Sequence, residues 1–376
     1  MTQSASHSRL SPITRRRLQV FRDNRRAWWS FWCFLFLFVL SLGAEMIAND
    51  KPIVMRYQGE WYTPLLVDYP ETDFGGFLPT TADYRDPFVK EEIEAHGWML
   101  WPPIPFRYDT LDQVLNHPAP SPPDGRHWLG TDDQGRDVLA RVIYGFRLSV
   151  LFALALTIGS LVLGVVFGGI QGYFGGKVDL IGQRLSEIWS GLPVLFLLII
   201  LASLVEPNIW WLLGIMLLFS WLGLVDIVRA EFLRARNLEY VRAARAMGLP
   251  AHLIMWRHVL PNAMVATLTF IPFLFTGAIT TLTALDFLGF GLPPGSPSLG
   301  ELVAQGKNNL QAPWLGITAF VSLSLMLSLL VFIGEGLRDA FDPRHIQKAA
   351  SGPVSARQPV IEADDLSLPQ ESTDER

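Results

Sequence analysis

Six long apolar runs constrain this chain more than any other feature of its sequence. Each has about the 20 residues that an α-helix needs to cross a hydrocarbon core of about 30 Å, and a helix pairs its own backbone polar groups where water is absent. Charged residues make up 17% of the chain, against about 25% in soluble proteins. We therefore predict an all-α integral membrane protein with about six transmembrane helices. The predicted helices cover residues 28–47, 148–170, 187–205, 209–228, 265–285 and 314–334.

Basic residues near the first apolar run predict how the chain is oriented. Segment 1–27 is rich in arginine and carries Asp23 as its acidic residue. Positive residues near the ends of spans stay in the cytoplasm, so this segment is predicted to be a cytoplasmic tail. The first run is longer than the apolar core of a signal peptide, which favours an uncleaved anchor. Six spans return the chain to the cytoplasm, where the acidic segment 346–376 is predicted to be a disordered tail.

A long polar insert, residues 48–147, separates the first two runs and is predicted to lie in the periplasm. It is rich in acidic residues and contains aromatic clusters such as Glu60-Trp-Tyr-Thr-Pro64 and Trp98-Met-Leu-Trp-Pro-Pro103, in strand-like or loop settings. Pro87 is well placed in the first turn of a short helix. The aromatic and proline content favours a small ordered cap over disorder. This cap is either a spacer or a contact surface for a partner outside the cytoplasm.

Motifs for catalysis and nucleotide binding are missing from the sequence. The pair Gly176-Lys177 is followed by Val178, and Gln171 stands where a P-loop requires its first glycine. Any ATP and Mg²⁺ must then be bound by another chain. There is no His-Glu-x-x-His motif for zinc. We predict no catalytic residue, no metal site and no cofactor in this chain, so that it is not an enzyme.

The fifth apolar run carries a stripe of threonines and a proline. Thr269, Thr276, Thr280 and Thr283 fall at spacings of 7, 4 and 3, on one face of a helix. These hydroxyls either bond back to their own helix or face a translocation path or a neighbouring subunit, and the pattern favours the second interpretation. Pro272 is predicted to kink the helix. Ionisable residues are not evident near the middle of the runs, which disfavours an ion-coupled secondary transporter.

A basic, alanine-rich segment lies between the fourth and fifth runs. From Glu239 to Gly248 an apolar face is predicted with helical spacing; it comprises Tyr240, Ala243, Ala244 and Met247. Gly248 is suited to end this helix in the left-handed conformation. A second helix is predicted over 252–260, with Leu260-Pro261 ending it. Such a hairpin can dock a partner in the cytoplasm or lie on anionic lipid headgroups, and the residues alone favour neither.

The same segment resembles the EAA loop of bacterial ABC importer permeases, through Ala243-Ala244, the glycine that follows, and Leu260-Pro261. Arg242 and His258 depart from the general pattern in the way that is familiar in the peptide-importer branch. The long insert is similar to that of the Yej-type permeases, which are associated with uptake of peptides and of the peptide-nucleotide microcin C. Three more segments match the peptide branch: Leu129-Gly-Thr-Asp-Asp-Gln-Gly-Arg-Asp137, Gly172-Tyr-Phe-Gly-Gly-Lys-Val-Asp179 and Gly336-Leu-Arg-Asp-Ala-Phe-Asp-Pro-Arg344.

The resemblance implies a type I ABC importer permease fold, with a five-helix core at 148–345 and a cytoplasmic coupling loop at 236–262. It implies a bacterial inner membrane protein that transports peptides with a homologous permease as heterodimer partner, two cytoplasmic ATPases that bind ATP and Mg²⁺, and a periplasmic substrate-binding protein. No nucleic acid is implied. A permease for nickel or another small solute is the alternative within the family. The implied coupling residues are Glu239, Tyr240, Ala243, Ala244, Met247, Gly248, His258, Leu260 and Pro261.

Overall fold

The computed structural model describes residues 12–206 and 208–342, and most of them are helical. Three of the described helices are each long and apolar enough to cross a membrane: α2 (Arg25–Leu42), α5 (Val138–Phe174) and α15 (Pro313–Phe341). Three bent pairs also qualify if each pair is one span: α6 (Gly176–Ser190) with α7 (Val194–Ser203), α8 (Ile209–Ser220) with α9 (Leu222–Ala235), and Ala251–Leu268 with α13 (Ile271–Phe287). The predicted helical membrane fold is confirmed. The predicted tail at 346–376 lies outside the described residues.

The second apolar helix begins earlier than the sequence predicts. α5 starts at Val138 rather than at residue 148, because the side chain of Asp137 caps it by accepting a hydrogen bond from the N–H of Ala140 (2.7 Å). Arg141 and Arg147 lie in the first three turns of α5 and lower their mean hydropathy, so an apolar run is not evident there. Residues 138–147, which the sequence places in the insert, therefore belong to α5.

Three of the predicted spans are bent where single helices were expected. The pairs α6–α7, α8–α9 and Ala251–Leu268 with α13 bend by 71°, 43° and 57°. The third bend lies at Thr269 and Phe270, and Pro272 follows in the first turn of α13, after Ile271. Proline lacks the N–H that would continue the helical bonding, so the predicted kink at Pro272 is confirmed.

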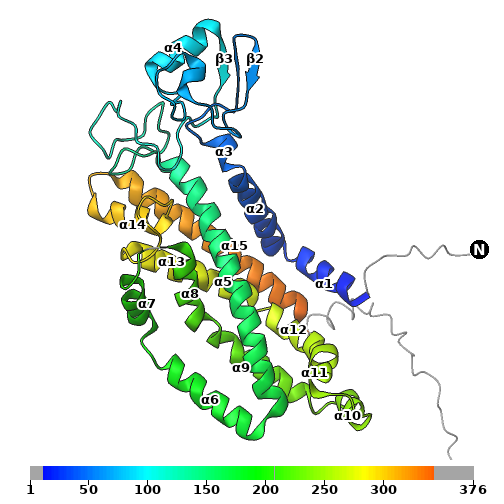
Figure 1. Cartoon of the computed structure of the whole chain (residues 1–376). Helices are drawn as coiled ribbons and strands as arrows, with labels where there is room; N and C mark the ends of the chain where they lie inside the picture. The colour runs from blue at the N-terminus through cyan, green and yellow to red at the C-terminus, as the bar shows by residue number, and fades with distance from the viewer. Residues whose placement is uncertain (1–11, 207, 343–376) are drawn as a thin grey trace, which may run out of the picture.

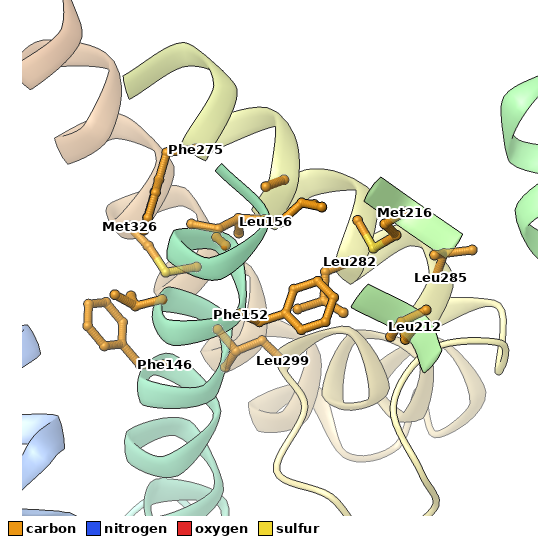
Figure 2. Close-up of a cluster of buried hydrophobic side chains, with 14 of the residues drawn as sticks. Phe146, Phe152, Leu156, Leu212, Met216, Phe275, Leu282, Leu285, Leu299 and Met326 are labelled. Carbon is orange, nitrogen blue, oxygen red and sulfur yellow. The ribbon is translucent and has the colours of Figure 1, made fainter. Parts of the chain in front are cut away.

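The core of the bundle is formed around α5 (Figure 1). Figure 2 shows Phe152 of α5 near Leu282 of α13 and Leu212 of α8, and Leu156 of α5 and Met326 of α15 belong to the same cluster. The cluster also includes residues of α14 (Leu299–Asn308). The short helices α1 (Pro12–Asp23) and α3 (Ala44–Ile47) precede and follow α2.

A row of glycines brings α5 and α9 into close contact. A Cβ atom at Gly164, Gly168 or Gly172 would lie 2.5, 2.7 and 2.5 Å from the nearest atom of α9. For Gly168 and Gly172 these atoms are the backbone carbonyl oxygens of Val225 and Arg229. The small residues thus allow the two backbones to touch. Close packing, which this spacing of glycines favours, is what the structure shows.

The insert folds around its own core at one end of the bundle (Figure 1). Its antiparallel sheet has the order β2 (Glu60–Tyr62), β1 (Val54–Tyr57), β3 (Gly97–Leu100). The inner face of the sheet packs with α4 (Pro87–His96) and the 3₁₀ turn η1 (Glu71–Phe74). The ordered cap and its helix at Pro87 agree with the sequence analysis, and the small sheet is an addition to an otherwise helical chain.

Candidate coupling site

A helical hairpin, residues 239–262, lies at the end of the bundle opposite the insert (Figure 1). It consists of α10 (Glu239–Ala246), a turn, α11 (Ala251–Ile254) and the π-helical turn η2 (Met255–Val259), and it continues into α12 (Leu260–Leu268). Gly248 has a φ of 79°, in the left-handed region that glycine adopts without steric cost. The N–H of Leu249 donates to the carbonyl of Ala244 (3.2 Å). The predicted left-handed helix end is confirmed.

The inner face of the hairpin packs on the ends of α5 and α9. Val241, Ala244 and Ile254 are at most 1% exposed. They share one apolar cluster with Tyr173 of α5 and Phe232 of α9. The hairpin is therefore packed onto the α5–α9 pair through a shared apolar core.

The outer face of the hairpin carries large exposed side chains. Tyr240, Met247 and Trp256 are 41%, 74% and 69% exposed, and Ala243 is exposed beside them. The apolar face predicted from the sequence is therefore divided, since Ala244 is buried and its three companions are not. Trp256 escaped the sequence analysis, although an indole within a basic segment is a recognisable signal. Tyr240, Ala243 and Met247 share one exposed face of α10, and the nearby residues Arg242 and Arg245 are also exposed. Trp256 lies apart from them and lines a groove with Ile170 and Phe174 of α5.

The helix does not end at Leu260-Pro261, contrary to the prediction. It runs from Ala251 to Leu268 as one segment, and the N–H of Leu260 donates to the carbonyl of Met255 in a π-helical turn. A proline ring normally collides with the carbonyl one turn earlier. The wider π-helical turn removes this conflict directly before Pro261, so the helix continues.

Asn262 ties the two arms of the hairpin together. Its Nδ2 donates to the hydroxyl of Tyr240 (2.8 Å) and to the carbonyl of His258 (3.3 Å). His258 itself is half-buried, whereas Glu239 is exposed at the start of α10. The predicted coupling residues thus lie on one hairpin.

The threonine stripe forms hydrogen bonds within its own helices. The hydroxyls of Thr269, Thr276 and Thr280 donate to the carbonyls of Ala266 (2.6 Å), Pro272 (2.8 Å) and Thr276 (2.9 Å). Thr280 is exposed, and Thr269, Thr276 and Thr283 are half-buried. Three of the four hydroxyls therefore bond within their own helices, which is the interpretation that the sequence pattern disfavoured. Thr269 lies before the 57° bend, so the four threonines do not share one helix face as predicted. The partial exposure of Thr276, Thr280 and Thr283 still allows this side of α13 to face another surface.

At the opposite end, the Leu129–Asp137 segment forms a buried ion-pair network that the sequence analysis missed. Asp132 pairs with Arg136 (2.6 Å) and lies 3.5 Å from Arg141. Both arginines reach Glu301 of α14, at 3.0 and 2.8 Å. The side chains of Asp132, Arg136 and Arg141 are at most 2% exposed, so breaking one of these pairs would leave a buried charge uncompensated.

His127 joins the loop of the insert to the start of α5. Its Nδ1 lies 2.8 Å from Asp137, and its Nε2 lies 3.2 Å from Asp112. Burial lowers the pKa of His127, but hydrogen bonds and charge from Asp137 and Asp112 outweigh it and raise the pKa above its ordinary value. Burial raises the pKa of Asp112, yet the N–H of Val114, His127 and neighbouring arginines hold it below its usual range. The two carboxylates therefore favour the protonated form of His127, which joins Asp112 of the insert to Asp137 at the start of α5.

The apolar helices and the exposed hairpin together define a membrane permease subunit. Residues 142–347 match the family of binding-protein-dependent transport system inner membrane components, and the chain belongs to this family. It is 62% identical to the inner membrane ABC transporter permease protein YejE of Escherichia coli (strain K12), over 89% of this chain and 98% of that protein. It is 61% identical to the peptidoglycan transport system permease protein YejE of Agrobacterium fabrum (strain C58 / ATCC 33970), over 89% and 94%.

A more distant relative is the oligopeptide transport system permease protein OppC of Haemophilus influenzae (strain ATCC 51907 / DSM 11121 / KW20 / Rd), which is 37% identical over 64% of this chain and 78% of that protein. The resemblance to Yej-type permeases is confirmed. The folded part of the insert, from β1 to β3, precedes the residues that match the family.

Proposed function

We propose that this chain is the permease subunit of an ABC importer that carries peptides, including microcin C-like peptide-nucleotides, across the bacterial inner membrane. Its relatives transport oligopeptides and peptidoglycan by name, which supports a peptide substrate over nickel or ion-coupled transport. The observation that carries the proposal is the exposed apolar face of α10, formed by Tyr240, Ala243 and Met247. In the proposed orientation both termini and the hairpin are cytoplasmic, and the insert is periplasmic.

The hairpin is the element that receives force from an ATPase. Its outer face docks on one of two cytoplasmic ATPases, which bind ATP and Mg²⁺, and its inner face holds it to α9. The helix from Ala251 to Leu268 carries displacement into the membrane as a rigid lever. The break at Thr269 and Phe270 lets α13 rotate relative to that lever. A homologous permease completes the path, and the exposed Thr280 faces it.

The insert serves as a docking platform for the periplasmic substrate-binding protein. Trp61 and Trp98 are 62% and 45% exposed, and their rings pack edge to face on the outer side of the sheet, 5.7 Å apart. Arg56 pairs in register with both residues between the two strands. Tryptophan and arginine dominate the binding energy of protein interfaces. The insert also carries exposed acidic side chains on η1, on α4 and in the segment between them: Asp73, Asp83, Asp86, Glu91 and Glu94.

The proposal is tested by purifying the complex through a tag on this chain. The variant Ala243→Glu/Met247→Glu should lose the co-purifying ATPases and ATP-driven peptide uptake, since two charges are placed in an apolar interface. The control Leu18→Glu changes an apolar residue that is 51% exposed on α1 and should retain both. Equal ATPase recovery from the two variants would refute docking at the hairpin.

A further inference from the structure

A cavity of about 280 Å³ lies between α5, α7, α8 and α13. Most of its lining is apolar and includes Leu156, Leu198 and Met216. Hydroxyls from three helices also line it: Thr157 and Ser160 of α5, Ser220 of α8 and Thr281 of α13. Such a mixture of apolar walls and a few placed polar groups is typical of ligand sites.

Thr157 is the anomalous member of this group. It is 3% exposed, and its hydroxyl has no hydrogen-bond partner among the described residues. Thr267, Thr276 and Thr280 behave differently, because each donates to a carbonyl of its own helix. A buried hydroxyl that forgoes this local bond calls for another partner. Ser160 and Ser220 bond each other at 2.6 Å, and their remaining hydrogen-bonding capacity is free for a ligand.

The cavity opens beside a partly exposed face of α13. Phe273 and Gly277 lie at its edge and are exposed, and Thr280 continues the same face one turn on. This face follows the bend at Thr269 and Phe270, so a movement of the lever would change the shape of the cavity.

We propose that this cavity is a subsite that holds one residue of the transported peptide during its passage. The inference rests on the proposed function. Cavities that enclose whole drug-sized ligands begin at about 300 Å³, so this one suits a single apolar side chain with its backbone amide. The apolar walls take the side chain, and Thr157, Ser160 and Thr281 bond the amide. A lipid acyl chain would leave these hydroxyls unpaired, which argues against lipid as the occupant.

The experiment uses the complete complex in proteoliposomes, with Cys33→Ala as background because Cys33 is the single cysteine of the chain. Thr157→Cys and Thr281→Cys are exposed to a small charged methanethiosulfonate reagent. Thr267→Cys is the control, since Thr267 is 0% exposed and bonded to Ala263. We expect labelling at 157 and 281 to be at least about tenfold faster than at 267, and to slow several-fold with the tripeptide Ala-Leu-Ala at saturating concentration.

A second pair of variants measures the contribution of the Thr157 hydroxyl to peptide uptake. Thr157→Val should lower Ala-Leu-Ala uptake about fivefold, the worth of one neutral hydrogen bond, and Thr157→Ser should restore it. Equal, slow labelling at 157, 281 and 267 would show a lipid-filled or dry cavity and overturn the subsite, as would labelling that the tripeptide leaves unchanged. Absence of ATP-driven Ala-Leu-Ala uptake by the unmodified complex would count against the proposed function instead.

Discussion

Gly248 offers the sharpest test of the hairpin, because strain and bulk can be separated there. Its φ of 79° costs a residue with a Cβ about 1–2 kcal/mol. A Cβ at this position would meet no described atom within 4 Å, so the chain itself adds no collision. Gly248→Ala and Gly248→Trp should therefore lose the same 1–2 kcal/mol of hairpin stability. Any larger effect of tryptophan must come from a surface that covers the turn.

We expect Gly248→Ala to keep most of its ATPase co-purification and uptake, and Gly248→Trp to lose at least about tenfold in both, equivalent to about 1.4 kcal/mol or more. Thermal unfolding of the isolated chain should place the two variants within about 0.5 kcal/mol of each other. Gly248→Asn serves as a further control, since asparagine tolerates the left-handed conformation. Should the tryptophan variant transport as well as the alanine variant, the turn is not covered by a partner and docking at the hairpin is refuted.

Three further predictions concern packing, pH and delivery. Gly172→Ala should destabilise the chain by about 1–3 kcal/mol through overpacking against α9. The control Gly223→Ala, whose Cβ would meet no described atom within 4 Å, should not destabilise it. Equal free energies of unfolding for the two variants in chemical denaturation would contradict this prediction. Because the folded pKa of His127 is raised, protonated His127 contributes its full stabilisation below about pH 6.5, and this contribution is lost as the pH rises through the folded pKa. The resistance of the insert to limited proteolysis should fall over the same pH range. His127→Gln should remove this pH dependence. Trp61→Ala/Trp98→Ala should weaken uptake with the substrate-binding protein present more than basal ATP hydrolysis, and unchanged uptake would make the insert a spacer.

Hydropathy and local chemistry predict the features that depend on neighbouring residues. The six candidate spans, the left-handed turn at Gly248, the kink at Pro272 and the helix at Pro87 all follow from short sequence patterns. The π-helical turn that carries the helix past Pro261 does not, because it depends on a small shift of backbone bonding that no residue type dictates.

Contacts between residues that are far apart in the sequence could not be predicted. Arg136 and Glu301 are 165 positions apart, and the charges of the Leu129–Asp137 segment carry no sign of which distant acid will pair with them. Likewise, the sequence shows that Ala244 can be buried but not that Tyr240, Ala243 and Met247 stay outside, since this depends on how α10 lies on α9.

Pro261 and Pro272 affect the helix in different ways, and this difference determines where it bends. If Pro261 broke the helix, the hairpin would be joined to the bundle through a flexible joint, and force on its outer face would bend that joint without moving the membrane helices. The π-helical turn keeps the lever intact from Ala251 to Leu268. The helix breaks instead at Thr269 and Phe270, just before the first turn of α13, which contains Pro272. In the proposed mechanism, displacement of the hairpin reaches the start of α13, which lines the hydroxyl cavity, so the proposed coupling and the proposed subsite meet on one helix.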